Sequence, residues 1–543
     1  MQNSHAPVSR LPTELLSEVF LCIVESCLQY GGLGFDWGTF RFRQVCKHWN
    51  NVAVGFPQLW VRWAPCAVKA WPLFNACSKD APIFLTWHFY HDLASSQDVL
   101  ADPAVPGRIR QLDFSGTSKK SQQFFGAFDY TPSSIASSIR AHIAIPTHGA
   151  GQEDTEQPTQ AHLARFFSSS FPKLSKLDIE NFQPDSSSPV FTTSNLTSLK
   201  LSFPYGTQPR YTLAQLSRIL QRHPNLQELD LGDGATPQLV STDAPVPFTL
   251  LQLVDLKLCG VAGCILKLIN LISLSLPLHN IVLHFRYPHN QNAQALVKSV
   301  KKILVAYYKC EGLDNPRKAD HFTISSSDVP KYGPLTFVAR SRSGPASTPQ
   351  SMLELRFDRA GELPKIFPLF PLNDTQEFTI EGMALSSNQY LAMLRKVKGI
   401  SHLHLSTLDI RPVLAALNPR NLGVSKGAPR LSRRITDAHV DDPTQQPVPE
   451  LGTLTLSHLD FLHEAVDDMT DVMRGRRDCK IGLKRLIVRL CRVSTADDDP
   501  SDLENLVEEI KWVDVEDMGL GYEGSDEDLG IDEFGCYSDD YYY

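Results

Sequence analysis

The chain has 543 residues, of which 42% are hydrophobic and 21% are charged, as is ordinary for a globular protein with ample length for a core. No stretch is apolar enough to predict a membrane span, and no basic segment followed by an apolar run predicts a secretory leader. The eleven cysteines form no C-x-x-C pair, which argues against zinc and favours reduced thiols. We therefore expect a protein of the cytoplasm, the nucleus or both.

The net charge of −8 is unevenly distributed. Residues 497–543 hold eighteen Asp or Glu and one Lys, so the remainder of the chain is net positive. A mildly basic body with an acidic tail is not typical of a nucleic-acid-binding protein. We expect no nucleic-acid partner and no membrane partner.

The first predicted element is a helix that begins at Leu11 and Pro12. Proline suits the first turn of a helix, where its missing N–H costs nothing. Apolar residues then recur at three- and four-residue spacing, which predicts one apolar stripe. Its members are Leu15, Leu16, Val19, Phe20 and Ile23.

A second helix is predicted over Phe40–Val54, followed by Pro57, Leu59 and Trp60, which end the unit. Its apolar face comprises Val45, Cys46, Trp49, Val52 and Ala53. The stretch Glu25–Thr39 between the helices contains three glycines and is predicted to be a loop. Two short amphipathic helices cannot bury both apolar faces alone, so they pack on the rest of this chain or on another protein.

The order LPTELLSEVF, VCKHW, VA and PQLW resembles the F-box, in the F-box-like form abundant in fungal genomes. The resemblance implies docking on Skp1, the adaptor of a cullin-RING ubiquitin ligase. It also implies that nine residues divide between the core and the Skp1 interface, with Leu11 and Pro12 as the expected direct contacts. The nine are Leu11, Pro12, Leu15, Leu16, Val19, Phe20, Val45, Cys46 and Trp49. The link Glu25–Thr39 is longer than is usual in the family, and we expect it to bulge from the surface.

Six of the seven tryptophans lie between Trp37 and Trp87, which predicts that the segment after the helical unit packs against it. Within that segment Ala81–Tyr90 is predicted to be a strand. His88 and His91 have no third partner nearby, so we interpret them as core or surface residues rather than metal ligands.

Further along, a weak pattern recurs ten times: a leucine or another aliphatic residue, two further residues, and then L-x-L or a variant of it, which predicts short strands with one buried face. The matches lie at 109–114, 174–179, 196–201, 226–231, 253–258, 271–276, 352–357, 400–405, 451–456 and 483–488. Helices are predicted at 213–222, 293–308, 387–397 and 463–474. The pattern resembles the leucine-rich repeat, and the alternative is an ordinary α/β domain.

The predicted fold is α+β: a small helical F-box-like module (1–65), an α/β leucine-rich-repeat-like solenoid or horseshoe (66–513) and an acidic disordered tail (514–543). We expect the solenoid to be continuous, with its poorest match at 280–351, and to close with 503–513. Leu229 and Leu256 should be buried strand residues.

No phosphate-binding loop, nucleophile elbow or metalloprotease motif is present. We therefore predict no catalytic, cofactor-binding or metal-binding residues and no enzymatic activity. What the F-box resemblance implies is a substrate-recognition subunit of an SCF-type E3 ubiquitin ligase, with Skp1 on the module and an unidentified target protein on the repeats. The alternatives are an F-box/repeat scaffold without a ubiquitination role, and an enzyme whose site the sequence does not reveal.

Overall fold

The structure is a computed structural model, and it divides into two compact units, Met1–Thr375 and Gln376–Tyr543. The residues that it describes are 11–30, 37–63, 70–87, 104–127, 135–144, 156–193, 195–203, 211–232, 235, 247–274, 278–286, 293–308, 318–326, 334–341, 351–358, 363–406, 409–420, 447–458, 460–461, 464–493, 501–514 and 516–517.

The first unit begins with a helical module. It consists of α1 (Thr13–Tyr30), the 3-10 helix η3 (Trp37–Gln44), α2 (Lys47–Gly55) and the 3-10 helix η4 (Pro57–Trp60). Aromatic rings form its core: Phe20 stacks on Phe42 with centroids 4.1 Å apart, and Phe40 stacks on Trp60 at 5.0 Å. The Trp60 indole N–H donates a 2.7 Å hydrogen bond to the Ala53 carbonyl, so the chain after α2 is fixed against that helix.

Two boundaries differ from the sequence prediction. Helix α1 continues to Tyr30 and η3 begins at Trp37, so both ends of the predicted loop 25–39 are helical, and residues 31–36 lie outside the described ranges. The predicted second helix is divided into η3 and α2. The first piece ends at Gln44, and Cys46 caps the second, since its Sγ accepts a hydrogen bond from the Trp49 N–H.

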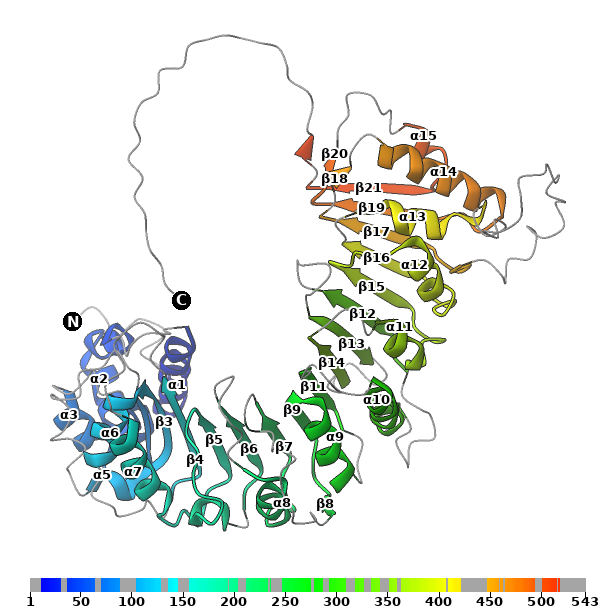
Figure 1. Ribbon diagram of the computed structural model, residues 1–543. Helices are drawn as coiled ribbons and strands as arrows, with labels where there is room; N and C mark the ends of the chain where they lie inside the picture. Colours follow the sequence, from blue (N-terminus) through cyan, green and yellow to red (C-terminus); the bar gives the residue numbers. More distant parts are fainter. Residues whose placement is uncertain are drawn as a thin grey trace, which may run out of the picture. The chain divides into compact units, whose positions relative to one another are not determined.

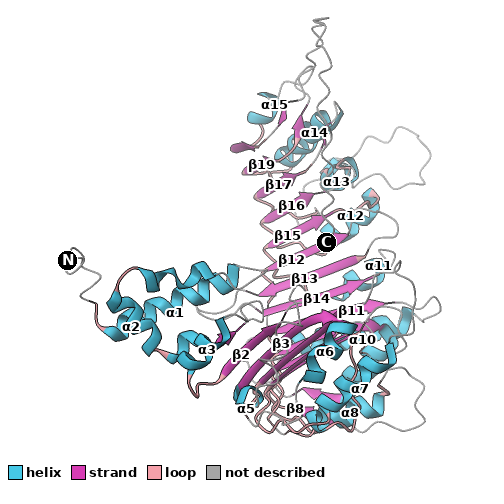
Figure 2. Cartoon of the chain, turned by 90° about the vertical axis from the view of Figure 1, so that its left-hand side faces the viewer, coloured by secondary structure: helices cyan, strands magenta, loops and turns pink. Residues whose placement is uncertain are grey.

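Helix α3 (Trp71–Ser78) connects the module to the sheet, which starts with β1 (Arg62–Trp63) and β2 (Ile83–Trp87). The Phe74 ring lies 5.2 Å from Trp60, and Arg108 donates hydrogen bonds to the Asn75 side chain and the Ala81 carbonyl. The expected packing of this segment on the module is confirmed, as is a strand within Ala81–Tyr90. His88 and His91 lie outside the described residues. Figure 2 shows α1, α2 and α3 gathered beside β2.

Parallel strands make up most of the first unit, in the order β1-β2-β3-β4-β5-β6-β7-β9-β11-β14. Beyond the first two, their bounds are β3 (Ile109–Thr117), β4 (Ser138–Ala144), β5 (Lys176–Glu180), β6 (Ser198–Ser202), β7 (Glu228–Leu231), β9 (Asp255–Val261), β11 (Asn280–Arg286) and β14 (Ser351–Phe357).

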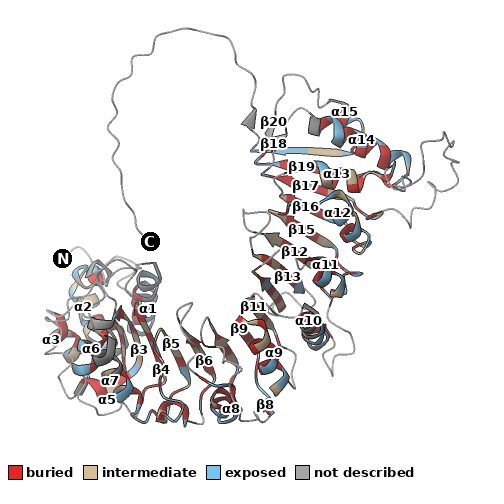
Figure 3. Ribbon diagram, in the orientation of Figure 1, coloured by how far each residue is buried: buried red, intermediate tan, exposed pale blue. Residues whose placement is uncertain are grey.

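Helical segments connect these strands, and Figure 1 shows α6 to α10 on one face of the sheet. They are α5 (Ala104–Arg108), α6 (Ser118–Ala127), α7 (Glu156–Phe167), η7 (Pro189–Phe191), α8 (Leu213–Gln221), α9 (Ala262–Leu271) and α10 (Ala293–Tyr308), with α11 (Leu363–Ile366) and η9 (Phe367–Leu369) after β14. Alternate strand residues face these helices and are buried (Figure 3). Leu229 and Leu256 are among them, at 0% and 3% exposure, as expected.

One of the seven matches in the first unit does not belong to this sheet. Leu271 ends α9, and Ile272–Leu274 form β10, which pairs with β8 (Phe248–Leu250) in a separate two-stranded sheet. The stretch 280–351 is also irregular, because β13 (Leu335–Ser341) runs antiparallel to both strands with which it pairs, β12 (His321–Ser326) and β14. An antiparallel pair does not need the leucine spacing of a parallel repeat, which explains the poor match there.

Among its described residues, the second unit contains five parallel strands in the order β15-β16-β17-β19-β21, and a small sheet β18-β20-β22. The strands are β15 (Glu377–Glu381), β16 (His402–Ser406), β17 (Thr453–Ser457), β18 (Asp460–Phe461), β19 (Arg485–Arg489), β20 (Arg492–Val493), β21 (Glu509–Val513) and β22 (Glu516–Asp517). The helices are α12 (Ser387–Leu394), α13 (Arg411–Leu417), α14 (Glu464–Asp478) and α15 (Ser501–Glu504).

The predicted α+β class is confirmed: a helical module is followed by strand–helix repeats of solenoid type. The segment predicted to close the array, 503–513, forms the end of α15 and the strand β21. Beyond Asp517 the predicted tail lies outside the described residues.

Candidate functional site

Helix α1 carries two adjacent apolar stripes rather than one. Leu16, Phe20 and Val24 are at most 1% exposed and point into the module's core, whereas Leu15, Val19 and Ile23 are 55%, 45% and 37% exposed. Residues four apart lie one above the other on a helix, so the second set forms a continuous line along the surface. Leu11, one turn earlier, extends it, and we call Leu11, Leu15, Val19 and Ile23 the exposed stripe.

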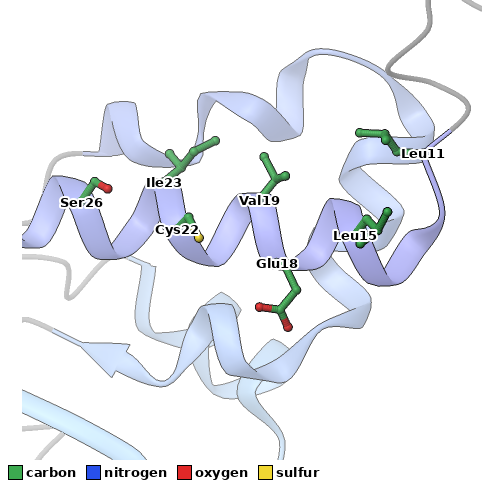
Figure 4. A pocket seen from close by; sticks show the side chains of 7 residues that line it. All are labelled: Leu11, Leu15, Glu18, Val19, Cys22, Ile23 and Ser26. Atoms are coloured by element: carbon green, nitrogen blue, oxygen red, sulfur yellow. The ribbon is translucent and has the colours of Figure 1, made fainter. Parts of the chain in front are cut away.

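A shallow hollow of about 650 Å³ follows this stripe (Figure 4). It is lined by Leu11, Leu15, Glu18, Val19, Cys22, Ile23 and Ser26, and Glu18 is the charged residue of that set. Four of the eight large apolar side chains that are exposed within the described residues belong to this small module. Such a concentration of exposed apolar side chains is typical of a protein-binding surface.

The residues predicted on the first helix therefore have different positions. Leu16 and Phe20 are core residues, while Leu15 and Val19 are on the exposed stripe. Leu11 is half-buried and lines the hollow. Pro12 is exposed, and its carbonyl accepts a 3.0 Å hydrogen bond from the Leu16 N–H, which starts the helix.

The three residues predicted near the second helix lie at its start. Val45 is 50% exposed, just before α2. Cys46 is the half-buried cap, and Trp49 is half-buried with its ring edge-on to Phe20, at a centroid distance of 5.2 Å. Trp49 therefore connects α2 to α1. The sequence prediction did not include Glu18, Cys22 and Ser26 among the site residues. These three recur at four-residue spacing, as do Leu11, Leu15, Val19 and Ile23, and that spacing was the signal that places both series on one side of the helix.

A second surface lies on the strands of the first unit, on the face opposite α6 to α10. Six charged residues of alternating sign occupy matched positions on six neighbouring strands. We call this row the charge ladder: Asp113, Arg140, Asp178, Lys200, Asp230 and Lys257. Arg140 bridges both of its neighbours, at 3.1 Å to Asp113 and 3.2 Å to Asp178, and Lys257 lies 3.2 Å from Asp230.

Burial and neighbouring charges both shift the pKa values of side chains in the ladder. Burial lowers the pKa of Arg140, but the carboxylates of Asp113 and Asp178 outweigh it, so that the pKa is raised overall. Burial raises the pKa of Asp230 more than the nearby Lys257 lowers it. Because the side chains of Arg140 and Lys257 are 60% and 55% exposed, these pairs remain accessible, and each contributes only about 0–1 kcal/mol to stability.

No family model matches the chain, and no curated protein matches it. Among solved structures, the chain is similar to a chain in the crystal structure of the Rad7 and Elc1 complex in yeast, with 11% sequence identity over 91% of this chain and 93% of that one. The TM-score is 0.26, a likeness too low to carry any argument about fold or function.

Two features are absent from the part of the chain that the structure describes. There, no helix combines the length and apolarity needed to cross a membrane. No group of three or more His, Cys, Asp or Glu side chains in that part is arranged to hold a metal ion.

Proposed function

We propose that this protein is the substrate-recognition subunit of an SCF-type ubiquitin ligase, and that the exposed stripe on α1 is where a Skp1-like adaptor docks. Two observations support the proposal. The sequence from Leu11 to Trp60 resembles the F-box, and α1 exposes an apolar residue at every fourth position, next to a shallow hollow. The second observation carries the argument, because a helix with one side in the core has no internal reason to keep a second apolar line in water.

The division of α1 suits a docking role. Leu16 and Phe20 anchor the helix to η3 and α2, so the exposed stripe is held rigid before a partner arrives. Rigid apolar anchors lose little conformational freedom on binding. Each large anchor at the centre of an interface typically contributes about 2 kcal/mol or more.

The charge ladder is our candidate surface for the target protein. Its six side chains are held in register by paired strands and are partly exposed. In this proposal the protein performs no chemistry itself, because the other subunits of the ligase transfer ubiquitin. Binding both partners raises the effective concentration of target lysines near the charged ubiquitin-conjugating enzyme.

The test replaces two anchors by a polar helix former: Leu15→Gln with Val19→Gln. Both side chains are exposed, so the fold should be unaffected, while affinity for purified Skp1 should fall by about thirtyfold or more, the equivalent of about 2 kcal/mol. Isothermal titration calorimetry measures the affinity, and circular dichroism checks the helix content. Leu251→Gln is the matched control, because Leu251 is 50% exposed but lies outside the module, and its affinity should match the wild type.

Equal affinities of the double variant and the wild type would contradict the docking face. If the unaltered protein binds no Skp1 at micromolar concentrations, the ligase assignment fails altogether. The remaining alternative is a scaffold without a ubiquitination role. Purification from cells distinguishes the two: Skp1 together with a cullin favours the ligase, and Skp1 alone favours the scaffold.

A further inference from the structure

Three side chains form a connected relay on the first unit, on the ladder face and away from α1. The Sγ of Cys259 lies 3.1 Å from Nδ1 of His284, and Nε2 of His284 lies 2.9 Å from an Oδ1 of Asp358. Cys259 and His284 are directly opposed on the neighbouring strands β9 and β11. Asp358 follows β14, the next strand. Parallel strands thus bring together three residues that are up to 99 positions apart in the sequence.

The chemistry of the three groups determines which ring nitrogen of His284 carries the proton. An ionised carboxylate accepts hydrogen bonds and cannot donate them, so the proton of a neutral His284 must be on Nε2, facing Asp358. Nδ1 is then an acceptor, and it faces the thiol. In such an arrangement the imidazole can accept the thiol proton, and a carboxylate behind it can stabilise the imidazolium that results. A thiol paired with a base in this way is the arrangement by which proteins activate a cysteine as a nucleophile.

Burial decides what can reach the thiol. Cys259 is 7% exposed, the His284 side chain is 18% exposed and the Asp358 side chain is 39% exposed, so exposure increases along the relay from the sulfur to the carboxylate. A protein-sized reagent would not fit a sulfur this recessed, whereas a small electrophile would. Cys259 is a thiol and not half of a disulfide.

We propose that Cys259, His284 and Asp358 form a reactive-thiol site that is modified by a small-molecule disulfide. The Cys259 thiolate attacks one sulfur of the disulfide, the reagent's S–S bond breaks, and a new S–S bond joins Cys259 to one half of the reagent. The other half leaves as a thiolate and takes the proton held on Nδ1 of His284. Cys259 is oxidised, the departing half is reduced, and no other reactant is needed.

Adduct formation would place a new group on the ladder face, because Cys259 follows Lys257 by two residues on the same strand. Lys257 is the last member of the charge ladder. The modification does not depend on the proposed adaptor or target, so its test is independent of the proposed function.

The experiment labels the full-length protein with iodoacetamide over pH 5–9 and quantifies each cysteine by peptide mass spectrometry. Cys264 is the internal control: it is 5% exposed, close to Cys259 in sequence, and burial raises its pKa to about 11. At pH 7 Cys259 should react at least about tenfold faster than Cys264, with a midpoint below the ordinary thiol value of about 8.5. Incubation with glutathione disulfide should produce a mixed disulfide at Cys259 before Cys264.

Two variants separate activation from structure. His284→Gln keeps a polar side chain but cannot take up the proton, so the midpoint of the Cys259 profile should rise to about 8.5 or above. Asp358→Asn, at a more exposed position, should raise it by a smaller amount. Melting temperatures check that both variants are folded. Labelling of Cys259 no faster than Cys264, or a pH profile unchanged in both variants, overturns the proposal.

Discussion

Leu15 and Leu16 are neighbours in sequence with opposite environments. Leu15 is 55% exposed and Leu16 is 0% exposed. The periodicity of α1 could not separate them, because apolar residues at both i+3 and i+4 cover two adjacent lines of one helix. Only the position of η3, with Phe42 stacked on Phe20, determines which line is covered. That contact depends on the tertiary fold and has no local sequence signal.

The two leucines therefore provide a matched pair for stability. Leu16→Ala should lower the free energy of unfolding by about 2–5 kcal/mol, because it leaves a cavity in the module's core. Leu15→Ala should change it by no more than about 0.5 kcal/mol. Urea unfolding followed by tryptophan fluorescence measures both. Similar losses for the two variants would mean that the exposed stripe is part of the core.

His223, which follows α8, is a buried residue that should make the free energy of unfolding depend on pH. It is 0% exposed, and burial lowers its pKa to about 4, whereas an unfolded histidine titrates near 6.5. The unfolded chain therefore takes up a proton first as the pH falls. The stability that depends on neutral His223 is complete above about pH 6.5 and is lost as the pH falls toward 4.

Between pH 7 and pH 5 this effect should remove about 2 kcal/mol from the free energy of unfolding. In His223→Leu the loss over the same interval should be smaller by about that amount, since leucine does not titrate. Urea midpoints of both proteins at pH 7 and pH 5 give the comparison. Parallel pH dependences would show that His223 is not the group responsible.

At the scale of elements, the leucine spacing predicted six of the ten parallel strands described for the first unit and three of the five described for the second, because alternation on a half-buried parallel strand leaves a direct pattern. The four predicted helices are present as α8, α10, α12 and α14, within a few residues of their expected ends. The spacing failed at 271–276, where the end of the apolar helix α9 imitates it. It also missed β12 and β13, because antiparallel pairing does not need the leucine spacing of a parallel repeat.

Strand β9 offers an element-scale prediction from two adjacent residues. Leu256→Ala should destabilise the first unit by about 2–5 kcal/mol, because Leu256 is 3% exposed against the helix layer. Lys257→Ala, on the opposite face and 55% exposed at its side chain, should cost at most about 1 kcal/mol despite its ion pair with Asp230. Thermal unfolding of the two variants measures the contrast. A larger loss for Lys257→Ala would mean that the charge ladder holds the sheet together.

At the scale of the whole molecule, two surfaces of different chemistry lie on different elements of the chain. The module presents an apolar line on a helix, and the sheet of the first unit presents alternating charges and the Cys259 relay. The chemistry of neither surface was apparent from composition. The relay in particular joins residues from two strands and from the end of a third, so no local motif marks it. The helices α1 and α2 did leave a local signal, because the apolar residues that predict them lie close together in the sequence.

Cys22 reports directly on the central claim, that the exposed stripe is the adaptor's docking face. It is exposed and lines the hollow beside Leu15 and Val19. The measurement is the maleimide labelling rate of Cys22 in the full-length protein, with and without saturating Skp1, resolved by peptide mass spectrometry. Cys479, at the C-terminal side of α14 in the second unit, is the internal control. We predict that Skp1 slows labelling of Cys22 by about tenfold or more and leaves Cys479 unchanged, as burial of an anchor surface requires; an unchanged Cys22 rate at saturation would contradict the account.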